Sequence, residues 1–177
     1  MKTRKLGNLE VSAIGMGCMG FTHAYGEGPE EKEGFRLVHF AFERGCTFFD
    51  TAEMYGYFNN EEFVGKALKE LPRDRVVIST KFWPEKLPGH TFEEDKLSET
   101  GIRKTLEGQL RRLQTDYIDI YTEHQMREGN EEEVAFVMGK LIQEGKIRAW
   151  GQSSPTAEQI KKAHAVTPIA AIQSEYS

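Results

Sequence analysis

Short apolar, β-prone runs alternate with amphipathic helical segments along the chain, and this alternation limits the fold more than any other feature. Six such runs follow one another, at residues 14–17, 47–50, 76–81, 117–122, 147–151 and 169–173. Helical periodicity predicts helices over residues 29–44, 60–70, 98–113, 131–144 and 156–165. A hairpin over residues 3–11, turning at Gly7 and Asn8, precedes them. Strands and helices in this order form right-handed βαβ units and a parallel sheet.

Two architectures fit such a sheet: an open doubly wound sheet and a TIM barrel. An open dinucleotide-binding sheet has a glycine motif between its first strand and a helix. Residues 15–20 have the required glycine spacing, but residues 21–26 do not open a helix. We therefore expect an α/β protein of the (β/α)8 TIM barrel type. About six of its eight βα units would lie in one domain over residues 1–177.

The composition excludes several other classes of protein. Hydrophobic residues make up 38% and charged residues 29% of the chain, which is typical of a soluble globular protein. A net charge of -5 gives no reason to expect nucleic acid as a partner. The N-terminus does not resemble a signal peptide, and no apolar window could span a membrane. Cys18 and Cys46 lack metal-ligand spacing, so we expect reduced thiols, no metal site and a cytoplasmic protein.

Four polar residues stand where predicted strands end. Asp50 closes the second run and Lys81 the third, His124 follows the fourth, and Tyr55 lies in the loop after Asp50. Each residue alone is more often a cap, a packing residue or a solvated side chain. In a parallel barrel, however, all C-terminal strand ends meet at one rim. The four side chains are therefore expected to converge on one pocket.

These four residue types suit proton donation to a carbonyl group. An ammonium beside a tyrosine stabilises the phenolate, so Lys81 would make Tyr55 a better general acid. Asp50 would keep the ammonium charged and in place. A neutral His124 would donate a hydrogen bond to the substrate oxygen and polarise it. No side chain supplies a hydride, so the reaction requires a redox cofactor.

Five segments of the chain resemble signatures of the aldo-keto reductases. Residues 47–56 resemble the family's F-x-D-T-A-x-x-Y-G motif, and residues 77–81 its catalytic-lysine strand. Residues 116–124 resemble the segment that brings the catalytic histidine, and residues 145–154 resemble G-K-I-R-x-x-G-x-S-N. Residues 168–177 resemble the following Q-x-E-Y-S strand. The motifs occur in family order from one end of the chain to the other.

The resemblance implies NADP(H)-dependent reduction of aldehydes and ketones to alcohols. The family's catalytic tetrad corresponds to Asp50, Tyr55, Lys81 and His124. Its cofactor-binding positions correspond to Asp50, Ser153, Ser154 and Gln173, the last three on the nicotinamide carboxamide. Ser154 stands where the family usually has Asn. The implied partner is a small carbonyl compound, with neither nucleic acid nor membrane involved.

Because the family barrel has eight units, the resemblance also implies that this domain is incomplete at its C-terminus. Exposed strand edges in such a partial barrel favour self-association. Two other functions stay open. One is a catalytically impaired or regulatory nucleotide-binding remnant of the same family. The other is an aldolase on a TIM barrel, in which Lys81 forms a Schiff base with its carbonyl substrate.

Overall fold

The computed structural model of the chain describes residues 1–22, 24, 26–84 and 96–176. His23 and Tyr25, which belong to the segment after the glycine motif, lie outside the described residues, and so does Ser177 of the last family-like segment. In the described part of the chain, no helix has both the length and the apolarity needed to cross a membrane.

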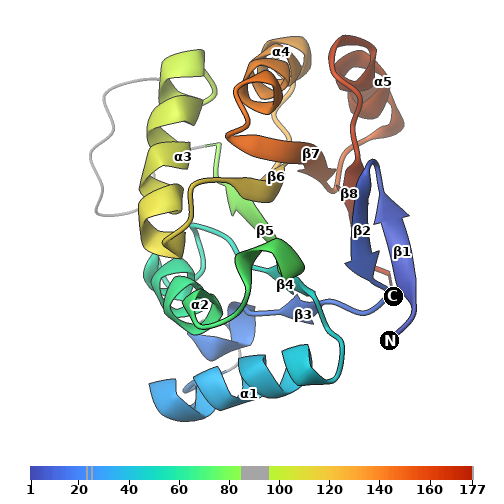
Figure 1. Cartoon of the computed structure of the whole chain (residues 1–177). Helices are drawn as coiled ribbons and strands as arrows, with labels where there is room; N and C mark the ends of the chain where they lie inside the picture. Colours follow the sequence, from blue (N-terminus) through green and yellow to red (C-terminus); the bar gives the residue numbers. More distant parts are fainter. Residues whose placement is uncertain (23, 25, 85–95, 177) are drawn as a thin grey trace.

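In the part of the chain that the structure describes, six parallel strands form one sheet in which the strand order follows the sequence. They are β3 (Met16–Gly17), β4 (Phe48–Asp50), β5 (Val77–Phe82), β6 (Ile118–Glu123), β7 (Ile147–Ser153) and β8 (Ala171–Gln173). The sheet curls, and helices of the described residues cover its outer face (Figure 1). They are α1 (Glu31–Glu43), α2 (Asn59–Lys69), α3 (Glu99–Leu113), α4 (Glu131–Gln143) and α5 (Ala157–Val166). The predicted α/β partial barrel is confirmed, with six strands and five helices among the described residues.

Helix ends follow the local chemistry of the sequence. The Ser98 side chain caps α3 by accepting a hydrogen bond from the Gly101 amide, 3.1 Å away. Thr156 and Gln159 form a reciprocal capping box at the start of α5. Gly45 follows α1 with a φ of 89°, a left-handed conformation that glycine adopts without a Cβ clash. The predicted stop signal at Gly45 is therefore confirmed.

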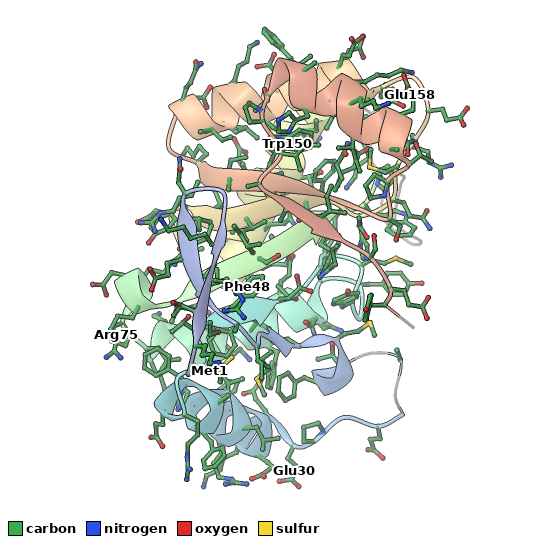
Figure 2. All side chains as sticks on the ribbon, turned by 90° about the vertical axis from the view of Figure 1, so that its right-hand side faces the viewer. Met1, Glu30, Phe48, Arg75, Trp150 and Glu158 are labelled. Atoms are coloured by element: carbon green, nitrogen blue, oxygen red, sulfur yellow. The ribbon has the colours of Figure 1, made fainter. Side chains whose placement is uncertain are left out.

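Apolar packing occurs on both faces of the sheet. The larger core lies between sheet and helices and includes the buried side chains of Phe49, Ile78 and Trp150. A smaller cluster consists of Val11, Val77 and Ile120, with Leu6, Leu9, Phe48 and Ala171 packed against them. This cluster joins the sheet to the antiparallel hairpin of β1 (Thr3–Leu6) and β2 (Leu9–Ser12). The hairpin crosses the strands of the sheet in the view of Figure 2 and lies beside β8 in Figure 1.

Several predicted boundaries were wrong by a few residues. The strand predicted from residue 14 begins only at Met16, and Ile14 is 68% exposed. The last strand begins at Ala171 rather than at residue 169, although the Ala170 amide still donates to the Trp150 carbonyl at 3.0 Å. As predicted, no α-helix opens directly after β3 among the described residues, where the chain forms a short 3-10 turn, η1 (Met19–Phe21). A second 3-10 turn, η2 (Arg73–Arg75), precedes β5.

Candidate active site

The structure brings the four residues of the predicted pocket to the C-terminal rim of the sheet. Asp50 ends β4 and Lys81 lies one residue before the end of β5. His124 directly follows β6, and its amide donates to the Phe82 carbonyl at 3.1 Å. Tyr55 lies in the loop between β4 and α2. The predicted convergence of these residues at one rim is therefore present in the fold.

The Lys81 ammonium is the centre of this group and is only 1% exposed. It forms an ion pair with Asp50 Oδ1, and it donates to the Thr51 carbonyl at 2.8 Å and to the Tyr55 hydroxyl at 3.3 Å. The other Asp50 oxygen, Oδ2, accepts a hydrogen bond from Ser79 Oγ at 2.9 Å. An ammonium has three N–H donors, so these three acceptors account for all of them. Asp50 Oδ1 and the Thr51 carbonyl, the other two acceptors, thus set the direction of the N–H that points to the Tyr55 hydroxyl.

His124 completes the group from the β6 side. Its ring lies edge-on to the Tyr55 ring at a centroid distance of 5.6 Å, and to the Trp83 ring at 5.1 Å. Burial and, after it, the positive charge of Lys81 lower the pKa of His124 to about 4, with the Asp50 carboxylate offsetting part of the shift. The imidazole is therefore neutral at pH 7. Its buried Nδ1 has no hydrogen-bond partner among the described residues.

The loop that carries Tyr55 has an unusual backbone. Gly56, Tyr57 and Phe58 have φ values of 57°, 47° and 79°, so three successive residues are left-handed. For residues with a Cβ this conformation costs about 1–2 kcal/mol each. The Phe58 amide donates to the Glu53 carbonyl at 2.8 Å, which closes the loop on itself. Strain of this kind persists only where surrounding contacts enforce it.

Glu53 connects this loop to the segment after β5, a role that the sequence analysis missed. The Glu53 side chain is 2% exposed, and its Oε1 accepts from the Trp83 amide at 2.6 Å and from the Lys96 ammonium at 2.9 Å. Trp83, in turn, contacts His124. The available signal was a carboxylate flanked by Ala52 and Met54 just after a strand, because a charged group next to apolar residues is buried only with partners.

Ser153, Ser154 and Gln173 occupy another part of the same rim. Ser153 and Gln173 are register partners at the ends of β7 and β8, and the Ser154 amide donates to the Gln173 carbonyl at 2.8 Å. The register aligns Lys81 with Thr122, and Thr122 with Gly151, so Ser153, two residues on, faces the same side as Lys81. Ser154 has a φ of 52°. Ser154 and Gln173 are exposed, in contrast to Lys81.

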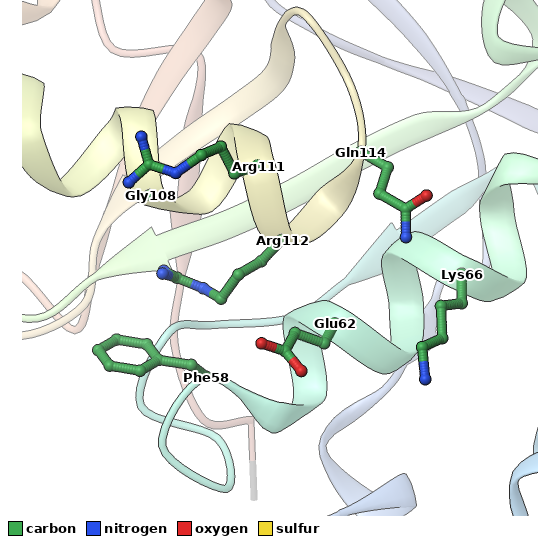
Figure 3. Close-up of a pocket in the computed structure, with 7 residues that line it drawn as sticks. All are labelled: Phe58, Glu62, Lys66, Gly108, Arg111, Arg112 and Gln114. Atoms are coloured by element: carbon green, nitrogen blue, oxygen red, sulfur yellow. The ribbon is translucent and has the colours of Figure 1, made fainter.

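A cavity of about 520 Å³ lies elsewhere, between α2 and α3. Figure 3 shows its mainly charged and polar lining, which consists of Phe58, Glu62, Lys66, Gly108, Arg111, Arg112 and Gln114. None of the residues predicted to bind substrate or cofactor lines it. Nor do three or more His, Cys, Asp or Glu side chains come together to hold a metal ion in the part of the chain that the structure describes. The rim remains the candidate site.

Residues 13–177 match the family model described as "Aldo/keto reductase family". The chain is 42% identical to a probable aldo-keto reductase 1 of Glycine max, covering 98% of this chain and 51% of that protein. It is also 42% identical to the aldo-keto reductase yakc [NADP(+)] of Schizosaccharomyces pombe, covering 99% of this chain and 52% of that protein. The chain thus spans about half the length of these curated relatives.

Solved structures give a consistent result. The holo form of aldo-keto reductase AKR11C1 from Bacillus halodurans superposes with a TM-score of 0.85 at 36% identity, over 100% of this chain and 58% of that one. The likeness therefore extends across every described strand of the curled sheet.

Proposed function

The chain belongs to the aldo/keto reductase family, and we propose that it reduces aldehydes and ketones to alcohols with NADP(H) as redox cofactor. One observation carries this proposal: the buried Lys81 ammonium contacts both the Asp50 carboxylate and the Tyr55 hydroxyl. The neutral imidazole of His124 packs against the same tyrosine ring. The name of the fission-yeast relative specifies NADP(+), which supports the choice of cofactor.

In the proposed reaction Tyr55 acts as the general acid. Its hydroxyl gives a proton to the carbonyl oxygen, and the Lys81 ammonium stabilises the phenolate that forms. Asp50 keeps that ammonium charged and oriented, while an N–H of neutral His124 donates to the same carbonyl oxygen. When bound, reduced nicotinamide supplies the hydride for the carbonyl carbon. A proton from solvent then restores the Tyr55 hydroxyl.

The rim has groups that fit a nicotinamide. We assign its carboxamide to Ser153, Ser154 and Gln173, because hydroxyl and amide side chains offer the donors and acceptors that an amide needs. Asp50, on the same face of the sheet, would lie at the cofactor's edge of the pocket. A Cβ added to Gly17, the register partner of Asp50, would meet no atom within 4 Å, so space is open at that point of the rim.

The Tyr55→Phe variant tests this assignment. It removes the proton donor but keeps the ring that packs against His124, so turnover should fall by at least about 100-fold. Turnover is followed as NADPH consumption with 4-nitrobenzaldehyde or a quinone. NADPH affinity, measured through the fluorescence of Trp83 and Trp150, should change by less than about twofold, because the lost hydroxyl is a proton donor rather than a binding anchor.

Tyr57→Phe is the matched control, since Tyr57 lies in the same loop but is 46% exposed. It should keep its turnover. A Tyr55→Phe protein that turns over like the unmodified chain would exclude Tyr55 as the acid.

The two alternative functions, a regulatory or impaired family member and an aldolase, predict different experimental results. NADPH binding without turnover in the unmodified chain would favour a regulatory or impaired family member. Borohydride trapping of a carbonyl compound on Lys81 would favour the aldolase. Against the aldolase stands the enclosure of Lys81, whose three N–H groups already have acceptors.

A further inference from the structure

We infer that Asn60 is a positioning residue that directs the Lys81 ammonium toward Tyr55, acting through Thr51. Asn60 is the second residue of α2 and is completely buried, although it touches neither Lys81 Nζ nor the Tyr55 hydroxyl. The inference rests on the proposed function, because it explains how the proposed proton donor is held in place.

The Thr51 carbonyl is one of the acceptors that orient the Lys81 ammonium. Lys81 can direct one N–H at Tyr55 only if its other two acceptors are fixed, and these are Asp50 Oδ1 and the Thr51 carbonyl. Ser79 Oγ holds Asp50 from its other oxygen. A small displacement of the Thr51 carbonyl would rotate the ammonium and lengthen the 3.3 Å contact with Tyr55. Thr51 therefore controls the geometry of the acid.

Two hydrogen bonds hold Thr51 in place, one from its backbone amide and one from its side chain. Its amide donates to the Ser79 carbonyl at 2.9 Å, and its Oγ1 donates to Asn60 Oδ1 at 2.6 Å. Thr51 and Asn60 are both 0% exposed, so water does not replace this hydrogen bond. In a dry interior such a bond is strong, and leaving either partner unsatisfied is costly.

The side-chain amide of Asn60 is in turn fixed by hydrogen bonds to the loop after β3. Its Nδ2 donates to the Cys18 carbonyl at 2.9 Å and to Thr22 Oγ1 at 2.8 Å, so the loop after β3 fixes the amide. Its backbone amide donates to the Tyr55 carbonyl at 3.3 Å. One side chain thus fixes an acceptor of Lys81, while the backbone of the same residue holds Tyr55. The adjacent Glu61 differs, since its carboxylate binds Thr80, Gln109 and Arg112 on the outer side of the sheet.

Three substitutions separate positioning from simple stability. Thr51→Val removes the hydroxyl that reaches Asn60 at nearly constant volume, Thr51→Ser keeps it, and Asn60→Ala removes the amide. Thr105→Val is the matched control, because Thr105 is a buried threonine whose Oγ1 has no hydrogen-bond partner among the described residues. Should Asn60→Ala fail to fold, Thr51→Val still removes the same hydrogen bond.

The kinetic result should be a loss of kcat without a loss of binding. We expect kcat to fall by about 10- to 100-fold in Thr51→Val and Asn60→Ala, because a misdirected ammonium supports the phenolate poorly. KM values for carbonyl and NADPH should stay within about twofold, since no binding group has changed. Thr51→Ser and Thr105→Val should keep kcat within about threefold. Equal kcat in Thr51→Val and Thr51→Ser would overturn the inference.

A second measurement needs no turnover. The nuclear magnetic resonance signal of the isotope-labelled Lys81 ammonium, assigned by its loss in Lys81→Met, should shift or broaden in Thr51→Val and Asn60→Ala. It should stay unchanged in Thr51→Ser and Thr105→Val. If the signal responds in this way but the unmodified chain consumes no NADPH, the proposed function fails while the positioning stands. An unaltered signal in Thr51→Val contradicts the positioning, whatever the turnover.

Discussion

The rim of the sheet has two halves that are built differently. On the side of β4 and β5, the Lys81 ammonium and the Asn60 amide are buried, and every donor they carry has an acceptor. On the side of β7 and β8, Ser154 and Gln173 are exposed, and β8 is an edge strand of three residues. The difference indicates that the proposed acid–base groups are preorganised within this chain, whereas the proposed carboxamide contacts depend on an exposed edge strand.

The boundary between the halves lies at β6 and β7. Glu123 and Gln152 are register partners there, and both are buried. Glu123 Oε2 and both amide atoms of Gln152 have no hydrogen-bond partner among the described residues. The donors of Lys81 and Asn60 therefore all have acceptors, whereas buried polar atoms at His124 and along this boundary have no partner in the part of the chain that the structure describes. Substitutions on either side of this boundary should have effects of different size.

The largest effect is expected at Lys81. In Lys81→Met the Asp50 carboxylate loses its cation, which should lower the free energy of unfolding by about 3 kcal/mol. Turnover should fall by about 1,000-fold, because the ammonium that stabilises the Tyr55 phenolate is removed. Thermal unfolding and NADPH consumption measure the two quantities.

Adding Asp50→Asn to Lys81→Met separates the two losses. The neutral amide needs no cation, so the double variant should regain most of the stability while turnover stays low. If the single variant were as stable as the unmodified chain, the described preorganisation around Lys81 would be incorrect.

A pH-dependent effect on stability alone is expected at the boundary. Burial and, after it, the nearby Glu131 carboxylate raise the pKa of Glu123 to about 8. The folded chain therefore binds this proton more tightly than the unfolded chain, whose glutamate titrates near 4.5. The resulting stability is complete below about pH 4.5 and is lost as the pH rises through about 8.

Glu123→Gln keeps a neutral side chain at every pH. Between about pH 5 and about pH 9 the variant should gain about 4 kcal/mol relative to the unmodified chain. Thermal unfolding across this range measures the gain. A parallel pH profile in the two proteins would show that Glu123 titrates normally.

The smallest effect is expected on the exposed side. Gln173→Ala removes one amide from the proposed nicotinamide contacts, so NADPH affinity should weaken by about fivefold, or about 1 kcal/mol. Ile172→Ala, on the opposite face of the same strand and also exposed, is the control. Fluorescence titration gives both affinities, and equal weakening in the two variants would assign the effect to β8 rather than to the amide.

The sequence predicted the fold closely because the signals for its elements are local. Alternating apolar runs, helical periodicity and stops such as Gly45 placed all six barrel strands and five helices within a few residues. The rim residues were predictable for a related reason. A polar residue that ends an apolar strand, such as Asp50 or Lys81, must face the open end of a parallel barrel.

The supports of the site were not predictable in this way. Helical periodicity gives no sign that Asn60 and Glu61, two polar residues in the first turn of α2, are completely buried. Their partners come from the loop after β3, from the residue that follows β4, from β5 and from α3, which no local pattern relates to α2. The left-handed Tyr57 and Phe58 were equally unexpected, since bulky residues seldom adopt positive φ.

The N-terminal hairpin has a consequence for how the chain folds. Leu6, Leu9 and Val11 are made early in synthesis, yet they pack with Ile120 and Ala171 in the inner cluster. Gly7 also approaches Ala170 so closely that an added Cβ would lie 2.9 Å from the Ala170 side chain. Contacts between such distant parts of a chain form slowly, because a long loop must close first. The hairpin should therefore pack against the sheet late in folding, after β8 has paired with β7, and this packing should stabilise the curled sheet.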